Sequence, residues 1–258
     1  MFKNLILLFL LGHILGDFYF QTSRMAERKM KEIKVLILHG ALYLLSCVLV
    51  ILPFFSLPFL CASVLLGFSH FGVDFIKSKL ASKQTESEKS RNPQSMREAK
   101  MFVIDQLVHL GFLAAAAYLL ALNGINAVPS GFALTFCSIL GVAQDDLVKW
   151  TVSILLVIEP ASIVTRKIFK FFRPIESQLN GKDDMGLGGA GAYIGIIERL
   201  FILIFLLFAQ YLAIGLVLTA KTLARYDRLS KEQTFAEYYL IGTLSSMLFA
   251  TAVYFLIF

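Results

Sequence analysis

Charge is scarce in this sequence. Aspartate, glutamate, lysine and arginine make up 16% of its 258 residues, against about 25% in an average soluble globular chain. Hydrophobic residues reach 57%, and the mean hydropathy is +0.73. This composition excludes an ordinary soluble domain. Several apolar runs approach the roughly 20 residues that cross a bilayer as a helix.

Cysteine is equally sparse. The three cysteines all lie in apolar segments, and no two of them form a CxxC pair: Cys47, Cys61 and Cys137. This spacing fits neither a disulfide framework nor a thiolate metal site, so we expect small core residues. The first apolar stretch lacks a small-residue cleavage site and runs on into further apolar segments. We therefore interpret it as a membrane helix and not as a cleaved signal peptide.

The net charge of +6 comes from basic residues that gather in loops between the apolar segments. This is the positive-inside pattern of membrane topology. It predicts membrane lipids as partners and no nucleic acid. The loop at 24–34 carries five basic residues, so we place it on the cytoplasmic side of a bacterial cytoplasmic membrane.

The apolar runs predict an all-α fold, a polytopic transmembrane helical bundle of six or seven spans. The first four spans are expected at residues 2–21, 35–52, 59–76 and 101–122. They form a four-helix membrane unit, residues 1–122, in which the polar linker 77–100 is a cytoplasmic loop. Residues 123–258 form a C-terminal membrane unit with a glycine-rich loop at 180–195.

The C-terminal unit is less regular in sequence. Residues 131–142 are apolar but short for a span, which indicates either a half-helix that re-enters the membrane or the start of a bent helix. The next span is expected at 147–164, and Pro160 should kink it or end it early. One helix over 192–226 and a last helix over 234–258 complete the chain.

This arrangement contains a conflict of topology. Basic residues cluster at 166–173 and again at 221–231, with one predicted span between them. A single span places its two ends on opposite sides of the membrane. One of the two clusters must therefore lie outside or along the interface.

Histidine and aspartate occur in three pairs with a spacing of four residues: His13 with Asp17, His70 with Asp74, and, in reversed order, Asp105 with His109. On a helix this spacing places both side chains on one face. The fourth histidine, His39, lies early in another apolar run. Counted from the cytoplasmic end of each helix at about 1.5 Å per residue, all seven side chains fall in one layer. The reversed pair fits this layer because its helix enters from the cytoplasm.

Imidazole and carboxylate groups without a thiolate predict a divalent transition metal, with zinc first and iron, manganese or nickel as alternatives. The expected ligands are His13, His39, His70 and His109. Asp17, Asp74 and Asp105 are expected to be further ligands or the catalytic general base. Seven candidates exceed one tetrahedral shell, so either two metals bind or some aspartates orient the imidazoles. A hydrogen-bonded structural cluster and a proton relay remain open as alternatives.

A metal at the cytoplasmic edge of a bundle could activate water for hydrolysis of a phosphate or acyl ester. The leading hypothesis is a membrane-embedded, metal-dependent hydrolase of a lipid or lipid-linked substrate, with Gln21 and Gln106 positioning the substrate. The alternatives are a proton- or metal-coupled transporter and a structural or regulatory membrane protein. Close helix approach around the site is expected at four glycines: Gly12, Gly16, Gly40 and Gly72.

Charged residues also mark the C-terminal helices. Five of them are candidate substrate residues, as an ion-pair network that binds an anionic headgroup: Glu198, Arg199, Lys221, Arg225 and Glu237. The alternative is interfacial anchoring, in which charges at helix ends reach the membrane surface.

The sequence resembles a bacterial integral-membrane family, domain-of-unknown-function family 3307. The resemblance rests on two blocks. The first contains His13-Ile14-Leu15-Gly16-Asp17-Phe18 with Gln21, His70 with Asp74, and Asp105-Gln106 with His109. The second contains residues 195–199, 221–225 and 237–243. It implies a membrane fold and no particular activity. The pair spacing is also loosely similar to that of membrane-bound metal-dependent hydrolases.

Overall fold

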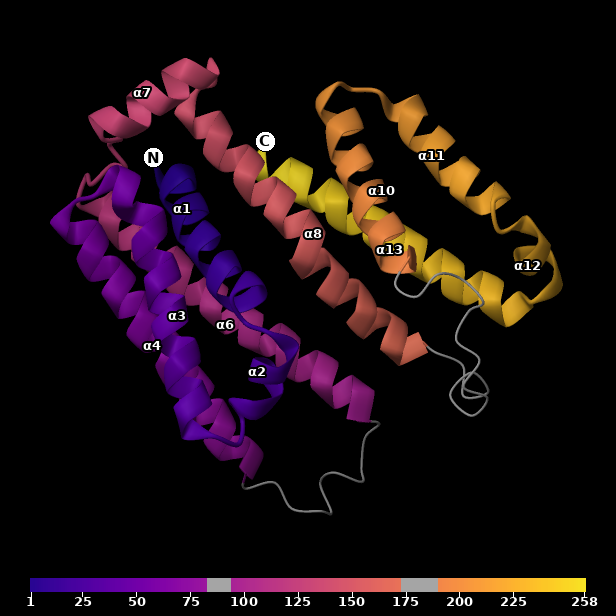
Figure 1. Ribbon diagram of the computed structural model, residues 1–258, viewed down its shortest axis with the longest axis horizontal. Helices are drawn as coiled ribbons and strands as arrows, with labels where there is room; N and C mark the ends of the chain where they lie inside the picture. The colour runs from indigo at the N-terminus through magenta and orange to yellow at the C-terminus, as the bar shows by residue number, and fades with distance from the viewer. Residues whose placement is uncertain (83–93, 173–189) are drawn as a thin grey trace. The chain divides into compact units, whose positions relative to one another are not determined.

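The computed structural model describes residues 1–82, 94–172 and 190–258, and over these residues every regular element is helical (Figure 1). The predicted all-α polytopic bundle is confirmed. The chain forms two compact units: unit 1, Met1–Val152, and unit 2, Ser153–Phe258. The boundary thus falls inside a helix, and the division predicted at residue 122 stays a prediction.

Unit 1 begins with a helix that changes its winding and continues as a series of helices. Its elements are α1 (Phe2–Ile14), the π-helical turn η1 (Leu15–Tyr19), α2 (Ser23–Arg28), α3 (Ile33–Ile51), the 3-10 turn η2 (Leu52–Phe54), α4 (Leu57–Ser82), α6 (Gln94–Leu122), α7 (Gly131–Leu140) and the start of α8 (Gln144–Phe172). Helix α1 packs against α3 and α6, and α4 packs against α3 and α6. These contacts close the predicted four-helix bundle (Figure 1).

The bundle is apolar at one end. Leu5 and Phe9 of α1 pack against Phe59 of α4 and Leu113 of α6, all at most 2% exposed. Histidines and aspartates come together on the later part of α1 and the corresponding parts of its neighbours. An apolar core therefore fills one end of the bundle, and a polar cluster fills the other.

The outer faces of the bundle are apolar as well. Large side chains of α3 and α4 are exposed, including Ile37 at 55%, Leu65 at 69% and Phe68 at 68%. A soluble protein buries such side chains, whereas here serines and histidines are buried and leucines face outward. Lipid contact accounts for this inverted pattern.

Among the described residues, seven helices are long and apolar enough to cross a membrane. They are Phe2–Tyr19, Ile33–Phe54, Leu57–Leu80, Ala99–Leu122, Gln144–Lys167, Ala190–Leu207 and Gln233–Ile257. Seven candidate spans agree with the predicted number of six or seven.

Helices are longer than predicted around the first linker. Helix α4 continues to Ser82 and α6 already begins at Gln94, so the predicted loop at 77–100 is wrong at both ends. The physical reason at the end of α4 is local: Lys77 continues the helix and lies 3.4 Å from Asp74 Oδ1, one turn earlier. Residues 83–93 lie outside the described residues.

Helix α7 is a short helix of its own. The Ser130 hydroxyl accepts from the Ala133 N–H at its start, and Gly141 ends it with a left-handed φ of 65°. The short separate helix agrees with the half-helix alternative for 131–142, and its re-entry into the membrane stays a prediction. The bent-helix alternative is wrong, since α8 begins separately at Gln144.

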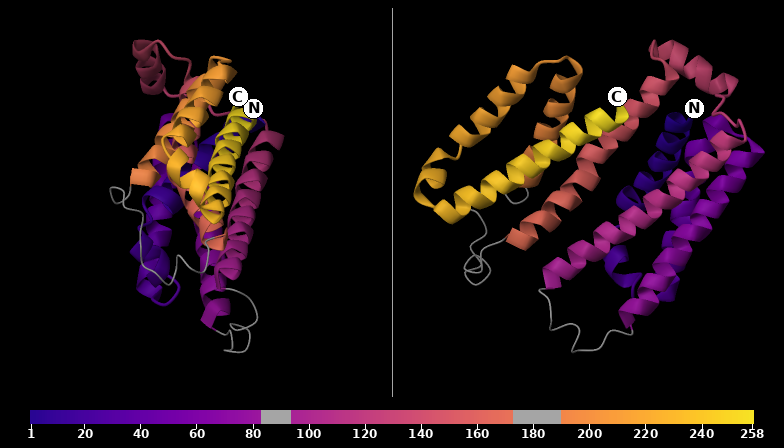
Figure 2. Two further views of the ribbon diagram at one scale, coloured as in Figure 1. Left: turned by 90° about the vertical axis from the view of Figure 1, so that its right-hand side faces the viewer. Right: turned by 180° about the vertical axis from the view of Figure 1, so that it is seen from behind.

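Unit 2 contains the remainder of α8, then α10 (Ala190–Leu207), α11 (Tyr211–Leu223), α12 (Tyr226–Lys231) and α13 (Gln233–Ile257). Helix α10 packs against α11 and α13, and α12 packs against α13 (Figure 2). The predicted glycine-rich loop at 180–195 ends earlier than expected, because Ala190 already begins α10. The rest of that loop lies outside the described residues.

The single helix predicted over 192–226 is wrong. The chain turns at Phe208–Gln210, where Ala209 takes a left-handed φ of 52°. Helix α11 then returns along α10, which brings Lys221 Nζ to 2.6 Å from Glu198 Oε2. Because the chain reverses here, Lys221 lies beside Glu198, halfway along α10, and the chain after it continues toward the start of α10. The conflict of topology is thereby removed within unit 2.

Helix α8 passes through Pro160 without ending, contrary to one of the two predicted outcomes. Pro160 has no N–H for the preceding turn of the helix. Arg199 of α10 donates to backbone oxygens of that turn, from Nε to Val157 at 2.5 Å and from Nη2 to Ile158 at 3.4 Å. The carbonyl that Pro160 itself leaves without a donor is that of Leu156, so Arg199 supports the turn around the proline through the two adjacent carbonyls.

Candidate metal centre

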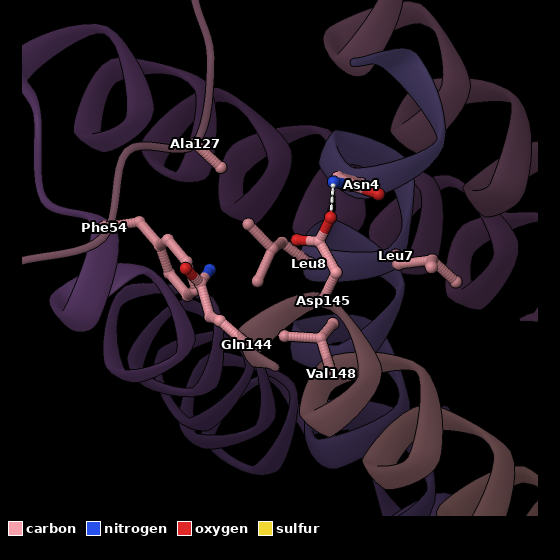
Figure 3. A pocket seen from close by; sticks show the side chains of 8 residues that line it. All are labelled: Asn4, Leu7, Leu8, Phe54, Ala127, Gln144, Asp145 and Val148. Carbon is pink, nitrogen blue, oxygen red and sulfur yellow. Dashed lines mark hydrogen bonds between the residues drawn. The ribbon is translucent and has the colours of Figure 1, made fainter. Parts of the chain in front are cut away.

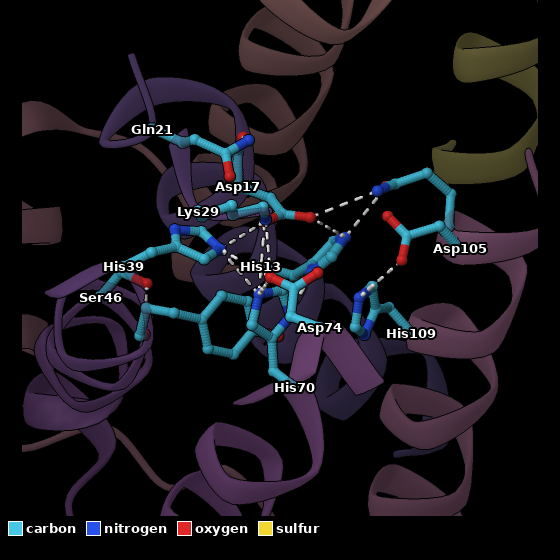
Figure 4. A network of polar contacts seen from close by, with 12 residues as sticks. His13, Asp17, Gln21, Lys29, His39, Ser46, His70, Asp74, Asp105 and His109 are labelled. Carbon is cyan, nitrogen blue, oxygen red and sulfur yellow. Dashed lines mark hydrogen bonds and ion pairs between the residues drawn. The ribbon is translucent and has the colours of Figure 1, made fainter. Parts of the chain in front are cut away.

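The four bundle helices of unit 1 carry the predicted histidines and aspartates to one place (Figure 4). All seven side chains are buried, with at most 9% exposed: His13, Asp17, His39, His70, Asp74, Asp105 and His109. Pairs on one helix keep the expected spacing, as between His70 Nε2 and Asp74 Oδ2 at 3.5 Å. The predicted convergence of imidazoles from separate helices is confirmed by these contacts.

A π-helical turn sets the position of Asp17. In η1 the Phe20 N–H donates to the Leu15 carbonyl five residues earlier, at 2.8 Å, and such turns often occur at functional sites. The extra residue per turn moves Asp17 away from direct pairing with His13: the His13 Nε2 to Asp17 Oδ2 distance is 4.0 Å. Gln106 connects them, because its Nε2 donates to Asp17 Oδ2 and its Oε1 lies 3.2 Å from His13 Nε2.

Four ligand-type atoms form the centre of the cluster. His39 Nε2 and His70 Nε2 lie 3.0 Å apart. Asp17 Oδ1 lies 3.2 Å from the first and 3.4 Å from the second. Asp74 Oδ2 lies 3.3 and 3.5 Å from the same two nitrogens. Helices α3 and α4, together with η1, therefore supply two adjacent imidazoles and two carboxylates that each contact both of them.

The contacts between these atoms have the spacing of metal ligands. With metal–ligand bonds of about 2.0–2.1 Å, neighbouring ligands of a regular tetrahedron lie about 3.3–3.4 Å apart. Five of the six distances among the four atoms run from 3.0 to 3.5 Å. Asp17 Oδ1 is buried and makes no hydrogen bond within the described part of the chain, although two ring nitrogens are close to it. Each carboxylate oxygen thus lies at ligand spacing from both imidazole nitrogens, as the ligands of a metal do.

Stacked rings fix the orientation of His70. Its imidazole lies on the Tyr43 ring, with centroids 3.7 Å apart and planes at 8°, and on the His109 ring at 4.2 Å. Tyr43 also places its hydroxyl 3.2 Å from His13 Nδ1. The Nδ1 atoms of His39 and His70 have no hydrogen-bond partner among the described residues. Ring packing therefore orients these imidazoles, whereas most metal sites orient a histidine ligand by a hydrogen bond to its second ring nitrogen.

Two lysines that were not predicted from the sequence also belong to the cluster. Lys29, from the turn after α2, is 6% exposed, and its Nζ lies 2.6 Å from Asp74 Oδ2. Lys77 Nζ lies 2.7 Å from Asp105 Oδ2. The spacing of Lys77 from Asp74, three residues on one helix, was a usable signal. Lys29 carries no comparable signal, because only the folded chain brings it to α4.

The loop that carries Lys29 has its own surface ion pair. Arg28 donates from Nε and Nη2 to the two Glu32 oxygens, both at 2.8 Å. This hydrogen-bonded pair lowers the pKa of Glu32 and raises the pKa of Arg28. Both groups are exposed, so the pair orders the surface of the loop and does not enter the cluster.

The charges of the cluster nearly balance. Three carboxylates face two ammonium groups, so with neutral imidazoles one negative charge is left over. Buried charge is tolerated when it is paired in this way. One divalent cation at the four-atom centre would change the sum to one positive charge.

The predicted substrate residues of unit 1 lie beside the cluster. Gln106 is part of it. Gln21 donates from Nε2 to the Asp17 backbone oxygen at 3.1 Å, and its buried Oε1 has no partner within the described ranges. Their role in substrate binding stays a prediction.

Three of the four glycines lie at close contacts, as predicted. A Cβ on Gly12 would lie 3.1 Å from Cys47 Cα, one on Gly16 2.7 Å from Tyr43 Cδ2, and one on Gly40 3.0 Å from Phe71 Cδ2. The prediction for Gly72 is wrong, because a Cβ there would meet nothing within 4 Å. Its position on α4 faces away from the neighbouring helices.

The five candidate residues of the C-terminal helices lie in unit 2 and form only part of the predicted network. Glu198 pairs with Lys221, as described above. Arg199 is instead held by α8 and α13, with donor bonds to Ser162 Oγ at 2.6 Å and Ser246 Oγ at 3.1 Å. Glu237 accepts from Gln233 Nε2 within its own helix. Within the described ranges, Arg225, one residue before α12, pairs with neither Glu198 nor Glu237.

A small pocket lies at the other end of α1 (Figure 3). The Asn4 amide donates to Asp145 Oδ2 there at 2.9 Å. Its lining residues are Asn4, Leu7, Leu8, Phe54, Ala127, Gln144, Asp145 and Val148. None of the predicted site residues lines it, so it is separate from the cluster.

Comparison with known proteins assigns the chain to a family. A family described as "Protein of unknown function (DUF3307)" matches residues 5–133, half of the 258-residue chain. The chain belongs to the DUF3307 family. The DUF3307 match includes every histidine and aspartate of the cluster and ends before α8, so unit 2 lies beyond it. No curated protein and no solved structure matches the chain.

Proposed function

We propose that this DUF3307 protein binds a divalent transition metal in the His/Asp cluster and hydrolyses a lipid or lipid-linked ester. Zinc is the first choice, and iron, manganese or nickel suit the same donors. The observation that carries the proposal is the convergence of two imidazole nitrogens and two carboxylate oxygens at 3.0–3.5 Å.

The groups around the four-atom centre exceed what metal binding alone requires. A bound ion would polarise an ester oxygen and make water a better nucleophile at neutral pH. Asp105 lies outside the four-atom centre, and its Oδ1 is free of hydrogen bonds within the described residues, so this carboxylate is available as a further ligand or as the general base. Lys29 and Lys77 supply positive charge for an anionic substrate. Gln106 orients both His13 and Asp17.

The proposed side of the membrane is cytoplasmic. Lys29 belongs to the basic segment between α1 and α3, and it contacts the cluster directly. The positive-inside rule places such a segment in the cytoplasm. A headgroup of the inner leaflet of a bacterial cytoplasmic membrane would then lie at the level of the cluster.

A hydrolase is favoured over a transporter by the other end of the bundle. The buried residues there are apolar, among them Leu5, Phe9, Phe59 and Leu113. A transported proton or cation needs polar groups across the whole membrane thickness. A cluster confined to one end of unit 1 fits chemistry at one membrane surface.

The first experiment is elemental analysis of the full chain, purified in detergent through an affinity tag that contains no histidine. At least one transition-metal ion per chain is expected. His39→Ala and His70→Ala should each lower the content at least tenfold, and Cys137→Ala, outside the cluster, should leave it unchanged. Absence of metal from the wild type, or unchanged content in both histidine variants, rejects the metal centre.

The second experiment tests hydrolysis. Phosphate-ester and acyl-ester lipids are offered in mixed micelles, with and without a chelator, and product release is measured. Turnover that falls at least a hundredfold in His39→Ala and on chelation supports the proposal. A metal-loaded protein that hydrolyses none of these lipids but conducts protons or metal ions in proteoliposomes would favour the transporter instead.

A further inference from the structure

We propose that the cluster holds a second divalent-ion subsite, formed by Asp74, Asp105 and His109, and that Lys77 competes with this ion for the two carboxylates. The proposal rests on the metal centre proposed above. It divides six of the seven side chains, all except His13, into a four-ligand centre and a three-ligand subsite that share Asp74.

Asp74 has the geometry of a bridging ligand. Its Oδ2 belongs to the four-atom centre, at 3.3 Å from His39 Nε2. Its Oδ1 is turned the other way, to 3.4 Å from Lys77 Nζ. Two-metal hydrolytic sites hold their ions about 3.5–4 Å apart, a separation that one carboxylate spans with its two oxygens.

Asp105 and His109 supply the unused ligand atoms. Asp105 Oδ1 and His109 Nε2 lie 3.5 Å apart on one turn of α6. Both atoms are buried, and neither has a hydrogen-bond partner in the described residues. A buried polar atom without a partner is costly, and a cation between these two atoms and Asp74 Oδ1 would satisfy both of them.

The His109 ring also lies next to the first centre. It stacks on the His70 ring, with the ring centroids 4.2 Å apart. His70 is a ligand of the first centre and His109 a ligand of the second subsite, so this stacked pair joins the two (Figure 4). Asp74, Asp105 and His109 bring three ligand atoms within 4.8 Å of one another. Three protein ligands leave a position open, as in catalytic sites.

Lys77 as a permanent counter-ion does not explain this geometry. Its ammonium group contacts Asp105 Oδ2 at 2.7 Å, but leaves Asp105 Oδ1 and His109 Nε2 without partners. The Lys77 side chain is 20% exposed, against 7% for Lys29. Lys77 is therefore the cation that can withdraw toward the surface on its flexible stem.

The charge of the cluster requires an anion beside the second ion. With one ion at the first centre and both lysines in place the cluster carries one positive charge, and a second divalent ion that displaces Lys77 would raise this to two. Buried charge of this size needs compensation. The second ion should therefore bind together with an anion, and a phosphate group fits the proposed ester substrate.

The test is equilibrium dialysis of the metal-stripped full chain in detergent against zinc, with metal counted per chain, in the presence and absence of inorganic phosphate. The wild type should bind two ions, the second at least tenfold more weakly than the first and more tightly with phosphate. Lys77→Gln should tighten the second ion at least tenfold. Lys79→Gln, an exposed lysine on the same helix, should behave as the wild type.

Three further variants locate the subsites. Asp105→Asn and His109→Ala should bind one ion, at the wild-type affinity of the first centre, which also shows that they fold. His39→Ala should lose the tighter ion. Saturation of both the wild type and Lys77→Gln at one ion, lost in His39→Ala, would overturn the second subsite and leave the first centre in place. Two ions in Asp105→Asn and His109→Ala would likewise overturn the subsite, and no ion in any protein would overturn both proposals.

Discussion

Gly16 lies directly against Tyr43. A Cβ on Gly16 would lie 2.7 Å from Tyr43 Cδ2 and 3.1 Å from Tyr43 Cα. The second atom belongs to the backbone of α3 and cannot move aside. Gly16→Ala should therefore separate η1 from α3, at a cost of about 1–3 kcal/mol for overpacking. It should also lower metal content, because the Tyr43 ring supports His70. Thermal unfolding in detergent and elemental analysis measure the two effects.

Gly72→Ala is the matched control. Gly72 is also a helical glycine near the cluster, but a Cβ there would meet nothing within 4 Å. Alanine is the better helix former by about 1 kcal/mol or less, so this variant should be as stable as the wild type or slightly more stable. Equal unfolding temperatures for the two variants would show that the contact between η1 and α3 is not close.

The cluster was predictable because its signal is local. A spacing of four residues places His70 and Asp74 on one helix face, and the reversed order of Asp105 and His109 follows from the direction of the helix. Lys29 was not predictable, since its contact with Asp74 joins residues 45 positions apart. The fold shows the same division: long apolar runs predicted the spans, whereas Phe208–Gln210 contains neither glycine nor proline to indicate the reversal after α10.

Lys29 should hold the segment between α1 and α3 on the cluster. Its ion pair with Asp74 is buried, and loss of one partner of such a pair costs about 3–5 kcal/mol. Lys29→Gln should therefore release this segment and accelerate trypsin cleavage after Arg24 and Arg28 at least tenfold. Limited proteolysis with mass spectrometry measures the rates at these two bonds.

Lys31→Gln provides the comparison, because it removes an exposed lysine and one trypsin site from the same segment. Its cleavage rates after Arg24 and Arg28 should match the wild type. The contact from Ser78 Oγ to the Met30 carbonyl remains in both variants. If Lys29→Gln is cleaved no faster than Lys31→Gln, the lysine does not anchor the segment.

Arg199 and Pro160 should be energetically coupled. Arg199 is 3% exposed and donates to the Val157 and Ile158 carbonyls and to two serines. Arg199→Met removes these bonds and should destabilise unit 2 by about 1–3 kcal/mol, since hydrogen bonds to charged groups are worth more than neutral ones. Pro160→Ala restores an N–H to the helix.

The double variant separates this coupling from a general loss of packing. Pro160→Ala restores a donor to the Leu156 carbonyl and removes the ring that distorts this turn, so the neighbouring carbonyls should depend less on Arg199, and Arg199→Met should cost less in this background than in the wild type. The difference between the two costs is the interaction energy of a double-mutant cycle. Equal costs in both backgrounds would mean that Arg199 stabilises α8 independently of the proline.

The reversal after α10 predicts the sidedness of unit 2. Arg199 lies beside Val157 and Ser162, and Glu198 lies beside Lys221, so Arg166 and Lys221 are near the same end of this unit while Ala209 is at the other. In a background in which Cys47, Cys61 and Cys137 are replaced by alanine, Arg166→Cys and Lys221→Cys should react with a membrane-impermeant maleimide from one side of the membrane. Ala209→Cys should react from the opposite side. A continuous helix over 192–226 would instead expose Arg166→Cys and Lys221→Cys on opposite sides, which labelling of intact and inverted vesicles distinguishes.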